Sequence, residues 1–166
     1  MSETTSQQLI HSVEAAFRSS GWQFRQVDGK DVIECEFEAH NAKVPLHVQT
    51  FSPGLVSVVS RLSFTISPES RAAVSEALMR TNLLLNLGNF ETDYDSGEVF
   101  FRVTNVFPDG VAQPTMITSL VHNALVEMDR ITPYLSELEK QPGQNVATLL
   151  SREDLMPAVG GDEGAG

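Results

Sequence analysis

Apolar and polar residues alternate with two different periods along the first part of the chain. Between about residues 5 and 20 the apolar positions recur every three or four residues, and Gly21 follows them. This spacing predicts an amphipathic helix. From Trp22 onward the period is two, and over residues 33–40 apolar side chains alternate with glutamates and a histidine. Such alternation predicts strands with one buried face and one face in water.

The same alternation predicts how neighbouring strands pair. We expect a two-residue turn at Asn41 and Ala42, which would pair Ala39 with Val44, Phe37 with Leu46, Cys35 with Val48, Ile33 with Thr50, Glu36 with His47 and Glu34 with Gln49. A three-residue turn over 52–54 keeps the next apolar residues on the buried face. It would place Val56, Val58, Leu62 and Phe64 beside Thr50, Val48, Leu46 and Val44.

Helix start and stop signals frame the next segment. Ser67 is a suitable N-cap, and Pro68 suits the first helical position. Gly88 can adopt the left-handed conformation that ends a helix. We therefore expect a second helix from about Pro68 to Leu87.

Two strands and a long helix complete the pattern. The strands cover about residues 89–94 and 98–105, joined by a turn at Asp95-Ser96-Gly97. The last helix begins near Pro114. Because the ring of Pro133 would clash with the preceding turn, we expect a kink or a restart there, with Thr132 as the new cap.

The element order α-β-β-β-β-α-β-β-α defines the expected fold class. Every strand connection is short enough for antiparallel pairing, so we predict an α+β protein with one antiparallel sheet covered on one face by helices. Residues 1–140 would form this domain. Residues 141–166 are rich in Gly and Pro and are expected to form a flexible acidic C-terminal tail, with at most one helical turn at Val146–Leu150.

The second helix carries more apolar residues than a sheet can cover. One stripe faces the core, running from Val74 through Leu84 and Leu85, and a second stripe lies on the opposite side. This second stripe and the asparagines at its boundary are Met79, Leu83, Leu87, Asn82 and Asn86. Either another helix of the same chain covers the stripe, or a second copy of the protein does so across a two-fold axis. The second interpretation is favoured. Each asparagine could also be solvated or bonded to nearby backbone.

Composition and charge restrict the possible partners. The 166 residues suit one domain, and a net charge of −11 disfavours nucleic-acid binding, which depends on clustered Lys and Arg. A single cysteine, Cys35, allows no internal disulfide. We see no secretory signal and no apolar run near the ~20 residues that cross a bilayer. These features predict a cytoplasmic protein without a membrane partner.

No group of residues predicts a reaction. Asp93 to Glu98 resembles a calcium loop only faintly, since its glycine and glutamate are misplaced, and a hairpin turn is favoured. The Glu36 and His47 pair suits an exposed cross-strand contact better than proton transfer. Cys35 alternates in phase with core residues, which favours a buried position over a nucleophile. We predict no catalytic residue, no metal and no cofactor.

One stretch carries a family resemblance. The run MRTNLLLNLGNFETDYDSGEVFFRV, followed by MDRITPYLSEL in the final helix, resembles the YbjN-domain family, whose fold is like that of type III secretion chaperones. The matching positions are Asn82, Asn86, Gly88, Phe90, Asp93, Gly97 and Phe101, with Asp129 and Pro133 in the final helix. The resemblance covers about residues 5–138. It implies a dimeric, non-enzymatic α+β module that binds other proteins or takes part in regulation.

The functional expectation follows from the second stripe and this resemblance. We expect a homodimeric protein-binding module, chaperone-like or regulatory, whose partner is a protein or peptide. The expected dimer interface is Met79, Asn82, Leu83, Asn86 and Leu87. Two alternatives stay open: a small-ligand-binding protein or enzyme with a pocket between sheet and helices, and an adaptor whose acidic tail recruits a basic partner.

Overall fold

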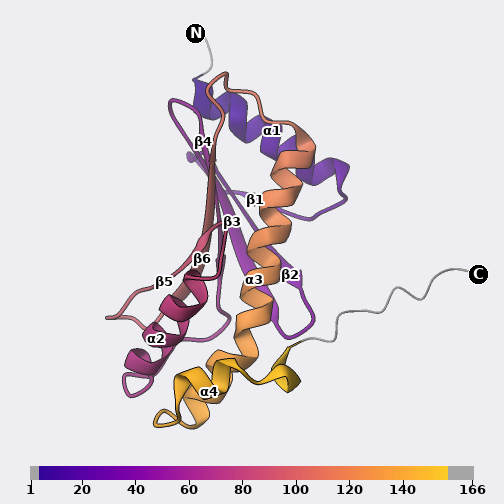
Figure 1. The fold of residues 1–166 in the computed structure, drawn as a ribbon. Helices are drawn as coiled ribbons and strands as arrows, with labels where there is room; N and C mark the ends of the chain where they lie inside the picture. The colour runs from indigo at the N-terminus through magenta and orange to yellow at the C-terminus, as the bar shows by residue number, and fades with distance from the viewer. Residues whose placement is uncertain (1–3, 157–166) are drawn as a thin grey trace, which may run out of the picture.

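The computed structural model describes residues 4–156 and confirms the α+β fold class (Figure 1). The elements follow the predicted order, with one added short helix near the end. They are α1 (Thr5–Ser19), β1 (Arg25–Gln26), β2 (Val32–Glu38), β3 (Lys43–Phe51), β4 (Leu55–Arg61), α2 (Arg71–Asn82), β5 (Asn89–Thr92), β6 (Val99–Val106), α3 (Pro114–Lys140), α4 (Val146–Leu150) and the 3₁₀ turn Glu153–Leu155. The sheet has the order β1-β2-β3-β4-β6-β5, and every pair is antiparallel.

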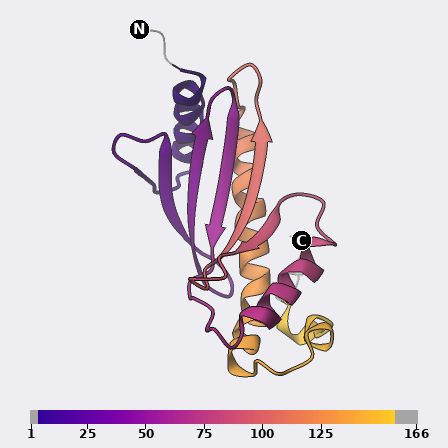
Figure 2. The same ribbon diagram turned by 90° about the vertical axis from the view of Figure 1, so that its left-hand side faces the viewer.

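Helices α1 and α3 cover one face of this sheet. In Figure 1 the sheet is seen nearly edge-on with both helices beside it, whereas in Figure 2 its open face points at the viewer. Their buried apolar side chains join those of the strands in one core. Helix α1 begins with a capping box, because the Thr4 hydroxyl accepts from the Gln7 N–H and the Gln7 amide accepts from the Thr4 N–H. Helix α2, α4 and the end of α3 gather at one end of the molecule.

A buried carboxylate in α3 fixes the turn between β2 and β3. Asp129, only 7% exposed, accepts hydrogen bonds from the N–H groups of Asn41 (2.7 Å) and Ala42 (3.3 Å) through Oδ1. Its Oδ2 accepts from Nδ2 of Asn41 at 3.2 Å. These bonds hold the tip of the hairpin against the middle of the helix that covers the sheet.

Pro133 explains why the backbone of Asp129 also takes part. A proline has no N–H, so the carbonyl four residues before it lacks its helical donor. That carbonyl belongs to Asp129, and Nδ2 of Asn41 donates to it at 3.1 Å. Helix α3 consequently continues unbroken from Pro114 to Lys140. The expected restart at Thr132 was wrong, and the Thr132 hydroxyl instead donates to the carbonyl of Met128 (2.7 Å).

The β2–β3 pairing differs from the prediction by two residues. Ala39 N–H donates to the Ala42 carbonyl (2.9 Å), so the turn is centred on His40 and Asn41 rather than on Asn41 and Ala42. The observed pairs include Ile33 with Val48, Cys35 with Leu46, Phe37 with Val44, Glu34 with His47 and Glu36 with Pro45. A shift of two keeps every side chain on its face, so alternation could not detect it. The hydrogen bonds that Asn41 and Ala42 donate to Asp129 select the observed turn.

The β3–β4 turn was predicted correctly, and the far end of β4 was not. Phe51 pairs with Leu55 across residues 52–54, and Val48 pairs with Val58 as expected. Leu46, however, pairs with Ser60, and β4 ends at Arg61. The expected pairings of Leu62 and Phe64 were therefore wrong, because both residues lie beyond the strand.

Helix α2 is shorter at both ends than predicted. Residues 67–70 form a turn closed by a hydrogen bond from Ser70 N–H to the Ser67 carbonyl (3.0 Å), and the helix begins at Arg71. The Glu139 carboxylate accepts from the Ser67 N–H (3.0 Å) and hydroxyl (3.2 Å). This contact with α3 uses the groups that would have capped a helix starting at Pro68. The helix ends at Asn82, five residues before the predicted end.

The packed part of the chain continues beyond Lys140, where the tail was expected to start. Helix α4 forms at the predicted residues, and its Val146 and Leu149 are buried. The Tyr134 hydroxyl donates to the Arg152 carbonyl (2.8 Å) and ties the following turn to α3. The rest of the expected tail, residues 157–166, lies outside the described residues. No helix within residues 4–156 is both long and apolar enough to cross a membrane.

Replacing Asp129 tests the contact between α3 and the hairpin. Asp129→Ala leaves the N–H groups of Asn41 and Ala42 without their acceptor, so we expect the free energy of unfolding to fall by about 2–3 kcal/mol. Urea denaturation followed by circular dichroism measures the change. Asp109→Ala removes an exposed carboxylate from the β6–α3 loop and should change stability by less than about 0.5 kcal/mol. Equal losses in the two variants would contradict the assigned role.

Candidate protein-binding surface

The chain leaves α2 through a tight turn that exposes several leucines. After Asn82 the backbone hydrogen bonds span three residues instead of four. Leu84 N–H donates to the Thr81 carbonyl (2.9 Å), and Leu85 N–H donates to the Asn82 carbonyl (3.2 Å). Gly88 then reverses the chain into β5 with φ +76°. A Cβ at this position would lie 2.4 Å from the Phe101 ring, so glycine is required by both backbone and space.

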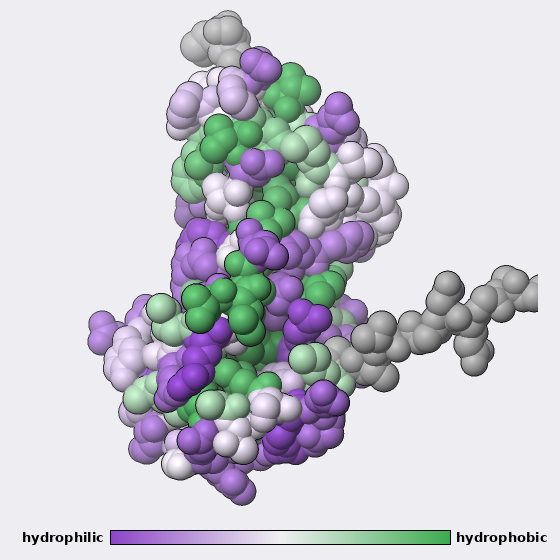
Figure 3. All heavy atoms as spheres, viewed as in Figure 1, coloured by the Kyte–Doolittle hydropathy of each residue, from purple (hydrophilic) through white to green (hydrophobic). Residues whose placement is uncertain are grey.

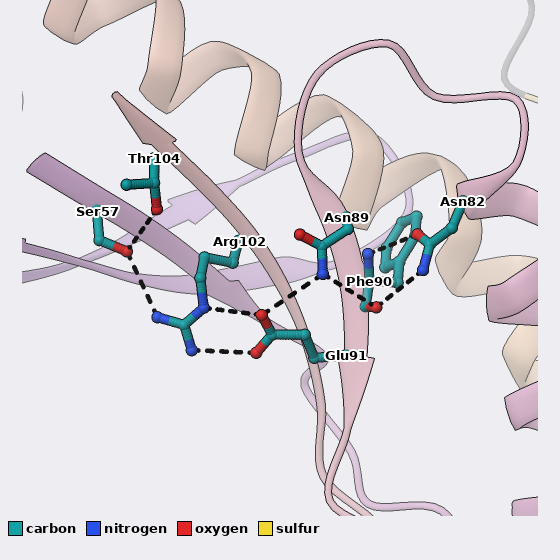
Figure 4. A network of polar contacts seen from close by, with 7 residues as sticks. All are labelled: Ser57, Asn82, Asn89, Phe90, Glu91, Arg102 and Thr104. Carbon is teal, nitrogen blue, oxygen red and sulfur yellow. Dashed lines mark hydrogen bonds and ion pairs between the residues drawn. The ribbon is translucent and has the colours of Figure 1, made fainter. Parts of the chain in front are cut away.

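Asn82 fixes the end of α2 to the sheet (Figure 4). Its Oδ1 accepts from the Phe90 N–H at 2.7 Å, and its Nδ2 donates to the Phe90 carbonyl at 3.0 Å. Strand β5 is an edge strand of the sheet. The asparagine therefore occupies the outer backbone groups that another strand would otherwise use at Phe90. Of the two interpretations of the asparagines, bonding to nearby backbone holds for Asn82.

Four large apolar side chains around this turn are exposed to solvent. Met79 is 69% exposed, Leu83 85%, Leu84 80% and Leu87 50%, and we call these four residues the leucine surface. Leu84 was expected to face the core. That expectation was wrong because the helix ends at Asn82 and the helical wheel no longer applies after it. The neighbouring Leu85 is half-buried and packs against the core. Exposed apolar groups gathered in one place mark interaction sites more often than scattered ones do.

A groove lies beside the leucine surface, between the end of α2, the second half of α3 and α4. Its volume is about 520 Å³, and we call it the α2–α4 groove. Its most buried lining residues are Phe90, Ile131 and Tyr134. Leu85, Ala147 and Leu150 add apolar walls, and Leu83, Leu84, Met156, Arg80 and Arg130 also line it. Apolar side chains reach the surface along the seam between the sheet and α3 and again in the lower half of the molecule (Figure 3).

The open face of the sheet carries polar contacts instead. Arg102 donates to both carboxylate oxygens of Glu91 (2.8 and 3.0 Å) and to the Ser57 hydroxyl (3.4 Å). The Ser57 hydroxyl also forms a hydrogen bond with the Thr104 hydroxyl (Figure 4). The hydrogen bonds from Arg102 hold the pKa of Glu91 below its usual range. His47 lies opposite Glu34, and the predicted pair with Glu36 was wrong. Burial, with a smaller contribution from the charge of Arg102, lowers the pKa of His47.

The remaining candidate groups have structural roles. Asp93 Oδ1 accepts from the N–H groups of Asp95 (2.9 Å) and Ser96 (3.1 Å), and these backbone bonds lower its pKa. Gly97 N–H donates to the Asp93 carbonyl (2.8 Å), which closes the hairpin turn favoured above over a calcium loop. No cluster of three or more His, Cys, Asp or Glu residues that could hold a metal is found within residues 4–156.

Cys35 is half-buried on the core side of β2. Its Sγ donates to the Leu46 carbonyl at 3.6 Å, and burial raises the pKa of the thiol to about 12. Because the thiolate is the nucleophile, this environment makes the side chain unreactive at neutral pH. The thiol therefore suits packing rather than covalent chemistry.

Solved structures with the same arrangement define the class of this protein. It is an α+β protein in which helices cover one face of an open antiparallel sheet. YbjN from E. coli, a candidate transcription regulator, superposes with a TM-score of 0.58 at 8% identity, over 80% of this chain and 92% of that chain. The protein therefore has a YbjN-like fold, as the resemblance implied.

Two further structures match less well. A chain of the HopA1–SchA chaperone–effector complex gives a TM-score of 0.49 at 15% identity, over 75% of this chain and 94% of that chain. An uncharacterized protein from Methanothermobacter thermautotrophicus gives 0.48 at 12% identity, over 82% and 99%. No protein-family model and no curated protein matches the sequence. At these identities the likeness describes the fold, and function has to be argued from the surface.

The two asparagines of the α2 end should respond differently to truncation. Asn82→Ala removes both bonds to the Phe90 backbone, so we expect the free energy of unfolding to fall by about 1–3 kcal/mol. Asn86→Ala changes an exposed side chain and should stay within about 0.5 kcal/mol of the parent protein. Urea denaturation of both variants provides the comparison. If Asn82→Ala unfolds at the same urea concentration as Asn86→Ala, the bonds to Phe90 do not stabilise the fold.

Thiol reactivity checks the environment of Cys35. At pH 8 a thiol with a pKa of about 12 is almost entirely protonated, whereas an ordinary cysteine has a large thiolate fraction. We expect a thiol-specific disulfide reagent to modify the folded protein at least about 100-fold more slowly than the urea-unfolded chain. Absorbance of the released chromophore follows the rate. Similar rates in the folded and unfolded states would show that the thiol is accessible and ionised.

Proposed function

We propose that this protein is a non-enzymatic protein-binding module that acts as a homodimer and uses the leucine surface as its interface. The observation that carries the proposal is the exposure of Met79 (69%) and Leu83 (85%) beside an ordered turn. Burying a leucine side chain contributes roughly 1.5–3 kcal/mol. In a two-fold arrangement each residue of the surface is buried twice, once from each copy.

The competing interpretation was that another helix of the same chain covers the second apolar stripe of α2. Within residues 4–156 no element covers the leucine surface, since α3 and α4 line the groove on one side of it and leave Leu83 in water. A second copy brings an identical apolar surface of the same size. This match of like surfaces is what favours self-association over an unrelated partner at this position.

The five predicted interface residues take two different roles in this proposal. Met79, Leu83, Leu87 and the exposed Asn86 would contact the second copy. Asn82 would act from inside the protomer, because both of its amide atoms bond to Phe90. It holds the turn in the shape that presents the leucines, since its amide bonds to the backbone of its own protomer.

A regulatory or chaperone-like role through protein partners suits the rest of the molecule. YbjN is described as a candidate transcription regulator. A net charge of −11 makes direct DNA binding by this chain unfavourable, because such binding draws on clustered positive charge. We therefore place any regulatory action in contacts with other proteins, in the cytoplasm, where a single unpaired cysteine stays reduced.

A charge placed in the leucine surface tests the dimer. Static light scattering at micromolar concentration should give twice the chain mass of 18.2 kDa for the parent protein. Leu83→Asp should give the mass of one chain, because the new carboxylate would be buried without a partner in the interface. The variant should still unfold cooperatively as a folded monomer, since Leu83 is 85% exposed in the protomer.

A matched control uses an exposed residue far from this surface. Val111 is 70% exposed in the β6–α3 loop, at the opposite end of the molecule from α2 (Figure 1). Val111→Asp introduces the same charge and should leave the mass of the dimer unchanged. A parent protein that stays monomeric, or a dimer that survives Leu83→Asp, would remove the leucine surface as the interface.

A further inference from the structure

The α2–α4 groove combines an apolar floor with two positive charges at its lining. Phe90, Ile131 and Tyr134 are each only 4% exposed, so the floor is built from the core itself. Arg80 and Arg130 also line the groove, and about half of each side chain is exposed, 52% and 50%. One carboxylate, that of Glu127, lines the groove as well. In a chain with twice as many acidic as basic residues, a lining with two arginines and one glutamate is a local exception.

Both guanidinium groups have donors to spare. Within residues 4–156 Arg80 donates one hydrogen bond, from Nε to Glu76 (2.8 Å), which leaves its two terminal nitrogens for a ligand. Arg130 Nη1 lies 3.6 Å from Glu127 Oε1, an ion pair too long for a hydrogen bond. The Arg80–Glu76 pair is exposed on both sides and contributes at most about 1 kcal/mol, so an incoming anion can compete with it.

The side-chain hydroxyls that line the groove, by contrast, already donate hydrogen bonds within the chain. The hydroxyls of Thr81, Tyr134 and Ser151 donate to the carbonyls of Ala77 (2.8 Å), Arg152 (2.8 Å) and Thr148 (2.7 Å). An extended peptide laid on this lining would lose water from its amide groups and find few partners for them. An alkyl chain has no such groups. The volume of about 520 Å³ also lies within the range of small-ligand pockets.

We propose that the α2–α4 groove binds a long-chain carboxylate, with its alkyl chain against Phe90, Ile131 and Leu85 and its carboxylate at Arg80 and Arg130. Apolar lining accounts for the chain, and the free guanidinium donors account for the anionic head. This site adjoins the surface of the proposed dimer, because Leu83 and Leu84 belong to both. Met79 and Leu87 of the leucine surface do not line the groove.

A chain-length series tests both parts of the ligand. Octanoate, decanoate and dodecanoate, each below its micelle concentration, are titrated into the protein in a calorimeter. Each added CH₂ that enters the groove should tighten Kd about fourfold, which corresponds to roughly 0.8 kcal/mol. Arg80→Gln and Arg130→Gln should each weaken dodecanoate about tenfold and leave dodecanol, which has no charge, unaffected. Arg61→Gln on the open sheet face serves as the control for charge.

Filling the groove provides a second, independent variant. Ala147 is exposed on α4 and lines the groove, so Ala147→Trp should block the site without disturbing the core. Thr148→Trp places the same side chain at an exposed position of the same helix that does not line the groove. We expect dodecanoate binding to be lost in Ala147→Trp and kept in Thr148→Trp. Thermal unfolding without ligand checks that both variants are folded.

Each other outcome contradicts the proposal. Absence of saturable binding, or a Kd that does not depend on chain length, would show that the groove is not a fatty-acid site. Equal binding by Ala147→Trp and Thr148→Trp would place the ligand elsewhere. If Ala147→Trp instead abolished dimerisation and no carboxylate bound, a second copy would be the occupant. The double variant Met79→Asp, Leu87→Asp separates the two proposals, because as a monomer it should still bind dodecanoate.

Discussion

The hydrogen bonds between Asp129 of α3 and the turn at Asn41 determine how the two layers of this protein fit together. A carboxylate that is 7% exposed is stable only when it has donors, and the hairpin tip supplies three of them. Pro133 adds a second requirement, since it frees the Asp129 carbonyl for Asn41 Nδ2. The contact fixes the β2–β3 register and the position of α3 along the sheet. The second half of α3, which lines the groove with α2 and α4, is placed by the same contact.

A comparable constraint shapes the end of α2. Two hydrogen bonds between the Asn82 amide and the Phe90 backbone, with the close approach of Gly88 to the Phe101 ring, turn the chain sharply into β5. The turn has to follow immediately after the last helical residue, so the leucines after Asn82 cannot continue along a helix that packs on the core. Leu83 and Leu84 are therefore directed into water, and Leu85 is the one that packs inward. The exposed surface is a consequence of how α2 is joined to the sheet.

Periodicity predicted which face each strand buries, and long-range hydrogen bonds decided what periodicity could not. The β2–β3 register shifted by two residues, a change that preserves the side of every side chain. The ends of α2 moved because Glu139 binds Ser67 and Asn82 binds Phe90, contacts between residues far apart or in different elements. The resemblance included Asn82 and Asp129, which make two of these long-range contacts, but not Ser67 or Glu139. The groove lies between α2 and the later helices α3 and α4, so no local pattern could indicate it.

The two apolar features at this end of the molecule differ in what can cover them. The leucine surface projects outward, so an occupant must be broad and apolar, as a second protein surface is. The α2–α4 groove is recessed, its hydroxyls are bonded within the chain, and its free donors are two guanidinium groups. A narrow apolar chain with one anionic end meets that combination without leaving polar groups unpaired. Likeness of fold to YbjN at 8% identity fixes neither surface. What each surface can bind follows from the side chains that line it in this protein.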